Sequence, residues 1–190
     1  MSITINGNGT ITGVSVGGLP DGIVDTDMIA ANAVTPAKST ITGGKLLQAV
    51  SHTMSSTFTT SQTTPQDVTG MSKAITPTAA NSKILVIFSI DLDNENGSNG
   101  DVYGAAKILR SVDGGSYSSI KGQVNGGRDM GDGAQYTPNS LIILDEPSYS
   151  LGNAITYKLQ AWSLHSNNTI SVSQSNYPRT SNIVLQEIGA

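Results

Sequence analysis

The stretch KILVIFSIDLD, residues 83–93, decides the fold class of this chain. Every second residue from 84 to 92 is apolar and falls on one face of an extended strand. The other face is apolar at Leu85 and Ile87 and polar at Ser89 and Asp91. A period of two is typical of a β-strand, and apolar character on both faces predicts a central position in a sheet.

Further strands of this kind are predicted along the rest of the chain after residue 46. They cover residues 68–75, 103–112, 117–121, 141–144, 154–164, 169–173 and 182–188. Turn signals such as Thr76-Pro77 and Asp113-Gly114 separate them. This regular spacing predicts a mainly β protein, with an antiparallel, jelly-roll-like β-sandwich over residues 46–190. We see no internal repeat of about 20–50 residues, which argues against a β-helix or a propeller.

The composition agrees with one domain of ordinary size and an appendage. The 190 residues are 37% hydrophobic and only 13% charged, with a formal net charge of −4. This apolar content is too high for a disordered chain. Without cysteine there are no disulfides and no thiolate metal sites. The sequence pI of about 4.9 argues against a nucleic-acid backbone as partner. No apolar run reaches the roughly 18–20 residues that would span a bilayer, so we expect no membrane insertion, and we expect no cleaved secretory signal.

The first 45 residues are patterned differently. Residues 3–5 and 10–12 alternate around Asn6-Gly7-Asn8-Gly9, and Asn-Gly is a strong hairpin signal. A two-stranded ribbon is marginal alone, so its apolar side needs a partner. In a trimer the partner would be the same ribbon of neighbouring chains. The alternative is that the ribbon packs as an edge strand on the main domain.

One short helix is predicted at residues 26–34, within the stretch GGLPDGIVDTDMIAANAVTPAKSTITGGK. Asp25 or Thr26 can cap its first turn, and Pro36 disfavours helical geometry at Thr35. About two turns result, fewer than the roughly 12–15 residues at which isolated helices become marginally stable. Such a helix must dock on its own chain, on a copy, or on another protein.

This N-terminal stretch carries a resemblance. The order GGLPDGIVDTDMIAANAV, after the opening SITINGNGTITGVSV, resembles the N-terminal segment of tail-fibre-like proteins from marine tailed bacteriophages. The match is close over residues 1–45 and looser through the remainder. The closing NIVLQEIGA is similar to the last strand of small phage fibre-tip domains. The motif specifies no chemistry, and its length and order make the match specific.

The resemblance implies a homotrimeric virion protein, a bacteriophage tail fibre or spike subunit. Its N-terminus would join the particle and its β domain would face outward for host attachment. We assign particle attachment to Leu19, Ile23, Met28 and Ile29, apolar residues of the segment that must dock. The alternative is a structural head fibre, decoration or cement protein that uses the same attachment segment and binds no receptor.

Receptor binding is predicted in the two longest polar loops, residues 93–101 and 123–137. They bring together acidic residues, one arginine and one aromatic residue, a mixture that suits a surface glycan. The candidates are Asp93, Asp101, Arg128 and Tyr136. The alternative is that both loops are merely solvated connections.

No stretch specifies catalysis. The run Asp91-Leu92-Asp93-Asn94-Glu95-Asn96-Gly97 resembles the start of a calcium loop, but Asn96 and Val102 stand where that pattern needs Gly and Glu. Nucleophile, zinc and phosphate-loop motifs are absent from the sequence. Glu146 and Glu187, the pair a glycosidase would need, are expected to be solvated or structural. A cell-wall or capsule hydrolase is thus only the third hypothesis, and we expect no enzyme, no cofactor and no specific metal site. Trp162 and Tyr157 are expected to fill the core or pack on a strand face.

Overall fold

The computed structural model describes residues 4–5, 7, 11–12, 44–94, 104–126, 136–173 and 180–190. The chain separates into two compact units, Met1–Ile41 and Thr42–Ala190. The helix predicted at residues 26–34 lies outside the described residues. The boundary after residue 45 and the docking role of the segment before it stay predictions.

In the first unit, two short strands form the predicted hairpin. They are β1 (Thr4–Ile5) and β2 (Ile11–Thr12). They pair antiparallel, with Thr4 opposite Thr12 and Ile5 opposite Ile11. The Asn-Gly repeat between them therefore connects two strands.

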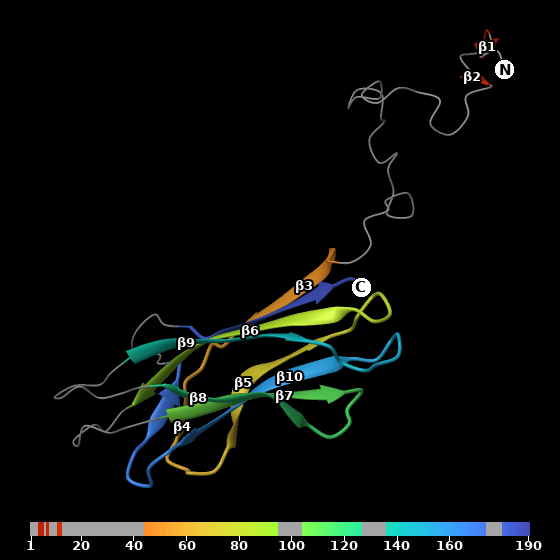
Figure 1. Ribbon diagram of the computed structural model, residues 1–190. Helices are drawn as coiled ribbons and strands as arrows, with labels where there is room; N and C mark the ends of the chain where they lie inside the picture. The colour runs from red at the N-terminus through yellow and green to blue at the C-terminus, as the bar shows by residue number, and fades with distance from the viewer. Residues whose placement is uncertain are drawn as a thin grey trace. The chain divides into compact units, whose positions relative to one another are not determined.

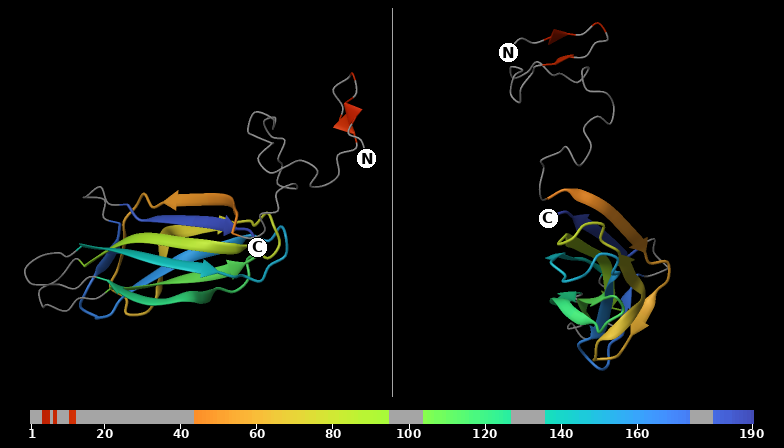
Figure 2. Two further views of the ribbon diagram at one scale, coloured as in Figure 1. Left: turned by 45° about the horizontal axis from the view of Figure 1, so that its top comes forward. Right: turned by 90° about the vertical axis from the view of Figure 1, so that its right-hand side faces the viewer.

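The second unit is built from two antiparallel sheets that form a sandwich, which confirms the predicted fold class (Figures 1 and 2). The smaller sheet has the order β5-β10-β7-β8, and the larger has the order β3-β12-β6-β11-β4 with β9 paired to β6. The smaller sheet contains β5 (Gln66–Ile75), β10 (Ile155–Ser163), β7 (Gly104–Val112) and β8 (Ser118–Gly126). The larger sheet contains β3 (Leu46–Thr53), β12 (Asn182–Ile188), β6 (Lys83–Asn94), β11 (Ile170–Val172), β4 (Phe58–Thr60) and β9 (Tyr136–Asp145).

Strand β6 is central in the larger sheet, as its sequence predicts. Its residues 84–93 pair with β9 along one edge. Its other edge pairs with β12 over residues 83–89 and with β11 over residues 92–94. Consecutive strands cross repeatedly from one sheet to the other, as in a jelly roll.

The core lies between the two sheets and consists of the inward-facing residues of nearly every strand. From β6 come Ile84, Val86, Phe88, Ile90 and Leu92, each at most 1% exposed. Tyr157 and Trp162 are buried too, which confirms their expected packing role. Packing is so close at Gly104 that a Cβ there would lie 2.9 Å from Cδ2 of Leu92.

Some strand limits differ from the prediction. The structure adds β3 and β4, and it extends the strand predicted at residues 117–121 to Gly126. Strand β9 begins at Tyr136, so both ends of the loop predicted at residues 123–137 belong to strands. Pro138 is tolerated because β9 is an edge strand in the described part of the sheet.

The sandwich has two distinct ends. At the first, which we call the entry end, Gly44 N–H donates to Gly189 O at 2.9 Å, and Gly189 N–H donates to Lys45 O at 2.8 Å. At the other, which we call the loop end, lie the residues that flank segments 95–103, 127–135 and 174–179. The strand register places these flanking residues at one end, because Asn94 pairs with Ile170, Asp93 with Tyr136, and Gly104 with Gly126.

Candidate interaction surfaces

The predicted receptor-binding residues divide into two groups. Asp101 and Arg128 lie outside the described residues. Asp93 and Tyr136 face each other in the β6–β9 register at the loop end. The predicted attachment residues Leu19, Ile23, Met28 and Ile29 also lie outside the described part of the chain.

The placement of Asp93 in an exposed loop was wrong. Asp93 belongs to β6, between β11 and β9 in register, and is only 1% exposed. A carboxylate buried to this degree is not presented at the surface. The receptor-binding role of the other three residues stays a prediction.

The base of segment 174–179 is fixed by hydrogen bonds. Ser181 N–H donates to Ser173 Oγ at 2.8 Å, and Ser173 N–H donates to Asp91 O at 3.2 Å. Asp91 N–H in turn donates to Ser181 Oγ at 3.1 Å. Ser173 has a φ of 58°, a left-handed conformation that reverses the chain here. These hydrogen bonds tie both flanks of segment 174–179 to β6.

Glu187 holds the entry end together. Its side chain is fully buried and accepts hydrogen bonds from the β5–β6 connection. Thr78 N–H and Ala79 N–H donate at 2.9 and 3.0 Å, and Ser82 Oγ donates at 2.8 Å. Gln48 Nε2 donates from β3 at 2.7 Å. One carboxylate thus joins β12, β3 and the connection that crosses between the sheets.

Two opposing effects set the pKa of Glu187. Burial acts to raise the pKa because it removes water from the charged form. The donors from Thr78, Gln48, Ser82 and Ala79 stabilise the charged form and together outweigh burial, so the pKa is lowered. Glu187 is therefore ionised at neutral pH and serves as a structural acceptor.

A second buried carboxylate joins the two sheets. Asp145, on β9, accepts from Arg110 Nη1 on β7 at 2.8 Å and from Tyr157 Oη on β10 at 2.8 Å. Burial and the neighbouring Asp145 raise the pKa of Tyr157, so its hydroxyl keeps the proton that it donates. The Arg110–Asp145 ion pair is largely shielded, with side chains 23% and 8% exposed.

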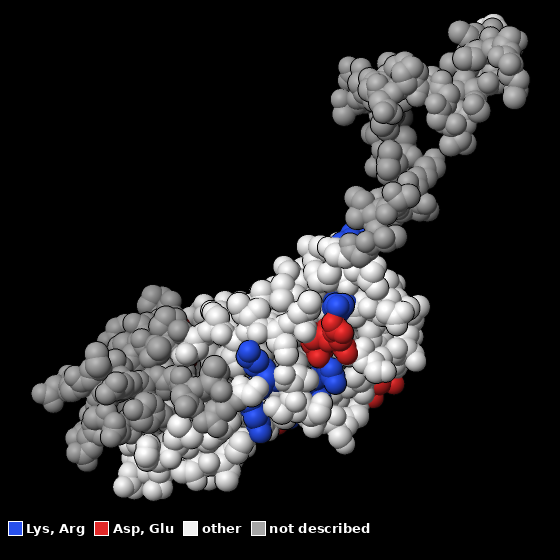
Figure 3. Space-filling model, in the orientation of Figure 1, with Lys and Arg blue, Asp and Glu red and all other residues white. Residues whose placement is uncertain are grey.

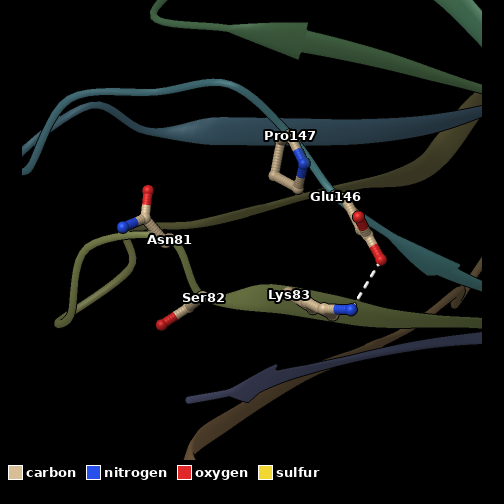
Figure 4. Close-up of a pocket in the computed structure, with 5 residues that line it drawn as sticks. All are labelled: Asn81, Ser82, Lys83, Glu146 and Pro147. Carbon is tan, nitrogen blue, oxygen red and sulfur yellow. Dashed lines mark hydrogen bonds and ion pairs between the residues drawn. The ribbon is translucent and has the colours of Figure 1, made fainter. Parts of the chain in front are cut away.

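A small hollow at the entry end is lined by Asn81, Ser82, Lys83, Glu146 and Pro147. Glu146 points across it to Lys83, and the two side chains form an ion pair of 2.6 Å (Figure 4). The hollow has a volume of about 200 Å³, which is below the roughly 300–1,000 Å³ of typical ligand pockets. With its two charges already paired, it does not resemble a built ligand site.

The outer face of the smaller sheet is polar. Lys158 Nζ lies 2.6 Å from Asp67 Oδ2 and 3.8 Å from the centre of the Tyr117 ring. The bond from Lys158 lowers the pKa of Asp67 despite partial burial. Lys107 lies 5.7 Å over Trp162 on the same sheet. These charged and aromatic groups pair with one another, which is typical of a solvated sheet face.

The outer face of the larger sheet carries a group of apolar side chains beside the polar Gln186. Ile142 and Leu144 of β9 are 52% and 49% exposed, and β6 places Ile87 and Leu85 beside them in register. Val184 of β12 lies on the other side of Ile87. We call this surface the outer apolar face, and define it by Leu85, Ile87, Ile142, Leu144, Val184 and Ile188.

Charged groups are sparse elsewhere. Figure 3 shows them as separate spots rather than a continuous patch of one sign on the side of the molecule it presents. Among the described residues, no three His, Cys, Asp or Glu side chains gather as a metal site would require. The described part of the chain also contains no helix with the length and apolar character needed to cross a membrane.

The buried acids had a signal in the sequence. In NIVLQEI, residues 182–188, the alternation that puts Ile183 and Leu185 in the core puts Glu187 there too. Leu141, Ile143 and Asp145 follow the same rule in β9. An acidic residue at a core position of a strand indicates a buried polar network. Its partners, far away in sequence, could not be predicted.

Comparison with known proteins does not place the chain in a family. No protein-family model matches the chain, and no curated protein matches it. The chain is similar to one in the solved structure titled "Structure of infectious bursal disease virus Gx strain", with a TM-score of 0.37 and 14% sequence identity. The match covers 75% of this chain and 37% of that one. A likeness of this degree carries no argument about function.

Proposed function

We propose that the protein is a homotrimeric bacteriophage fibre or spike subunit, which joins the virion through its N-terminal segment and adheres to the host surface through its β domain. One observation carries the proposal. The chain enters the sandwich at Gly44, at the entry end, while three segments are anchored at the opposite, loop end. A protein attached at its N-terminus would thus direct these segments away from the particle. The resemblance of residues 1–45 to phage fibre segments gives independent support.

The loop end is suited to adhesion because a rigid sheet supports variable connections. Segments 95–103 and 127–135 are flanked by β6, β7, β8 and β9, all hydrogen-bonded in the two sheets. The acidic, basic and aromatic residues Asp101, Arg128 and Tyr136 provide acceptors, donors and a flat ring for a sugar. A surface glycan is therefore the receptor class that we propose.

Replacing Asp101, Arg128 and Tyr136 together with alanine should abolish most host-cell adsorption and leave the melting temperature nearly unchanged. Asp93 is left intact because it is buried. The measurement is adsorption of particles that carry the variant, together with glycan-array binding by the isolated protein.

A matched control is available at the entry end, where Lys83→Ala, Glu146→Ala and Leu151→Ala remove one base, one acid and one large apolar side chain. Their side chains are exposed, and the Lys83–Glu146 pair is a surface pair. This control should adsorb normally. Normal adsorption by the loop-end variant as well, with no glycan bound by the parent, would instead favour a structural head fibre, decoration or cement protein.

A further inference from the structure

The two outer faces of the sandwich differ in a way that solvent exposure does not explain. The smaller sheet presents paired charges, including Lys158 and Asp67, to its outside. On the larger sheet, the outer face of β6 carries no charge between Lys83 and Asp91, and Lys83, opposite Ile188 in register, is paired with Glu146 at the border of this area. A contiguous apolar area of this kind on a soluble protein usually marks a contact surface.

The size of the outer apolar face limits what it can bind. It spans three strands, β12, β6 and β9, which gives roughly 200 Å² in projection from the usual strand spacing. A stable interface buries about 800 Å² on each partner. The face is therefore large enough to form the centre of a contact but too small to hold a free partner in solution.

The small area of the outer apolar face is offset by the position at which the chain enters the sandwich. Leu46, 53% exposed, opens β3 and pairs with Ile188 of the outer apolar face, directly after the anchored residues Gly44 and Lys45. Copies joined through their N-terminal segments would thus be joined next to this face. Such tethering raises the effective concentration to about the millimolar range, at which a small apolar contact suffices.

We propose that the outer apolar face packs against the β domains of the other copies of this chain. The inference rests on the proposed homotrimer and adds the surface at which its β domains meet. The charged residues at its border, Lys83 and Glu146, form an ion pair, so the face has no net charge. This suits contact between identical copies, because each chain has a formal net charge of −4 and like charges would repel at a shared contact.

The absence of cysteine from the chain permits a direct test with the full-length protein. Ile142→Cys places one thiol on the outer apolar face, and Ser72→Cys places one on an exposed position of β5, on the smaller sheet. The rate of maleimide labelling of each is compared with its rate in denaturant, and the mass is measured by sedimentation equilibrium. We expect a trimer in which the thiol at 142 reacts about tenfold or more slowly than the thiol at 72, because access controls the rate. Leu144→Cys is the second variant if the first folds poorly.

The outcomes separate the two proposals. A trimer in which the thiols at 142 and 144 react as fast as the thiol at 72 would overturn the inference and leave the homotrimer standing. A monomer with a reactive thiol at 142 would overturn both. A monomer in which that thiol is protected would also overturn both, because a segment of the same chain would then cover the face.

Discussion

Glu187→Ala is expected to lower the free energy of unfolding by about 3–5 kcal/mol, because several buried donors lose the charged acceptor that they share. The carboxylate accepts from Thr78, Ala79, Ser82 and Gln48, and its removal leaves these donors without their acceptor. Each unsatisfied buried donor costs about 1–3 kcal/mol, reduced where water can enter. Since a domain is stable by only about 5–15 kcal/mol, this one change should remove a large part of the stability.

Chemical denaturation of the variant and the parent measures this loss. Glu146→Ala is the matched control, because that glutamate lies at the same end in a surface ion pair, with its side chain 67% exposed. Exposed pairs contribute about 0–1 kcal/mol, so the control should unfold almost like the parent. Equal stability of the Glu187 and Glu146 variants would contradict the role of Glu187.

The same network predicts an acid dependence. Because the pKa of Glu187 is lowered on folding, its contribution is fully present above the ordinary value of 4.5 and is lost as the pH falls through the folded-state pKa. Glu187→Gln cannot titrate. The stability difference between parent and Glu187→Gln should therefore shrink below pH 4.5 and stay constant at higher pH.

Asp145→Ala is expected to have a similar effect, about 3–5 kcal/mol, for a different reason. The change leaves the Arg110 guanidinium partly buried without its anion, and it leaves the Tyr157 hydroxyl without its acceptor. Because these residues come from β9, β7 and β10, the loss weakens the contact between the two sheets. Thermal unfolding followed by far-UV circular dichroism measures it.

A double variant isolates the ionic part of this effect. Arg110→Met removes the orphan charge, so Arg110→Met with Asp145→Ala should be more stable than Asp145→Ala alone. Tyr157→Phe should cost only about 1.5–3 kcal/mol, the value of one hydrogen bond to a charged group. If the double variant were the less stable of the two, the buried charge would not be the cause.

Most of the fold could be predicted from local patterns. The alternation in residues 83–93 gave a central strand, and β5, β7, β10 and β12 lie where apolar alternation and turn signals placed them. The prediction from sequence was wrong where strand pairing overrides the local conformational preference of the residues. Residues 123–126 and 136–140 contain glycine and proline signals, yet ladders with β7 and β6 make them strands.

The candidate sites were harder to predict than the strands. Asp93 ends the predicted strand and begins the predicted polar loop, and the structure places it in β6, opposite Ser171 and Tyr136, with its side chain buried. Residues 141–144 are apolar without a break, so the sequence predicted a strand but not which side chains face outward. The burial of Leu141 and Asp145 in the structure shows that Ile142 and Leu144 lie on the outer side.

The most direct test of the proposed virion role is deletion of residues 1–45 from the protein in assembling particles, with antibody against the β domain as the probe. The proposal predicts that the truncated chain folds, keeps the far-UV spectrum of a β-sandwich and is absent from purified particles, while the parent labels projections from their surface. A truncated chain that still appears on particles, or a parent that labels none, would contradict attachment through the N-terminal segment.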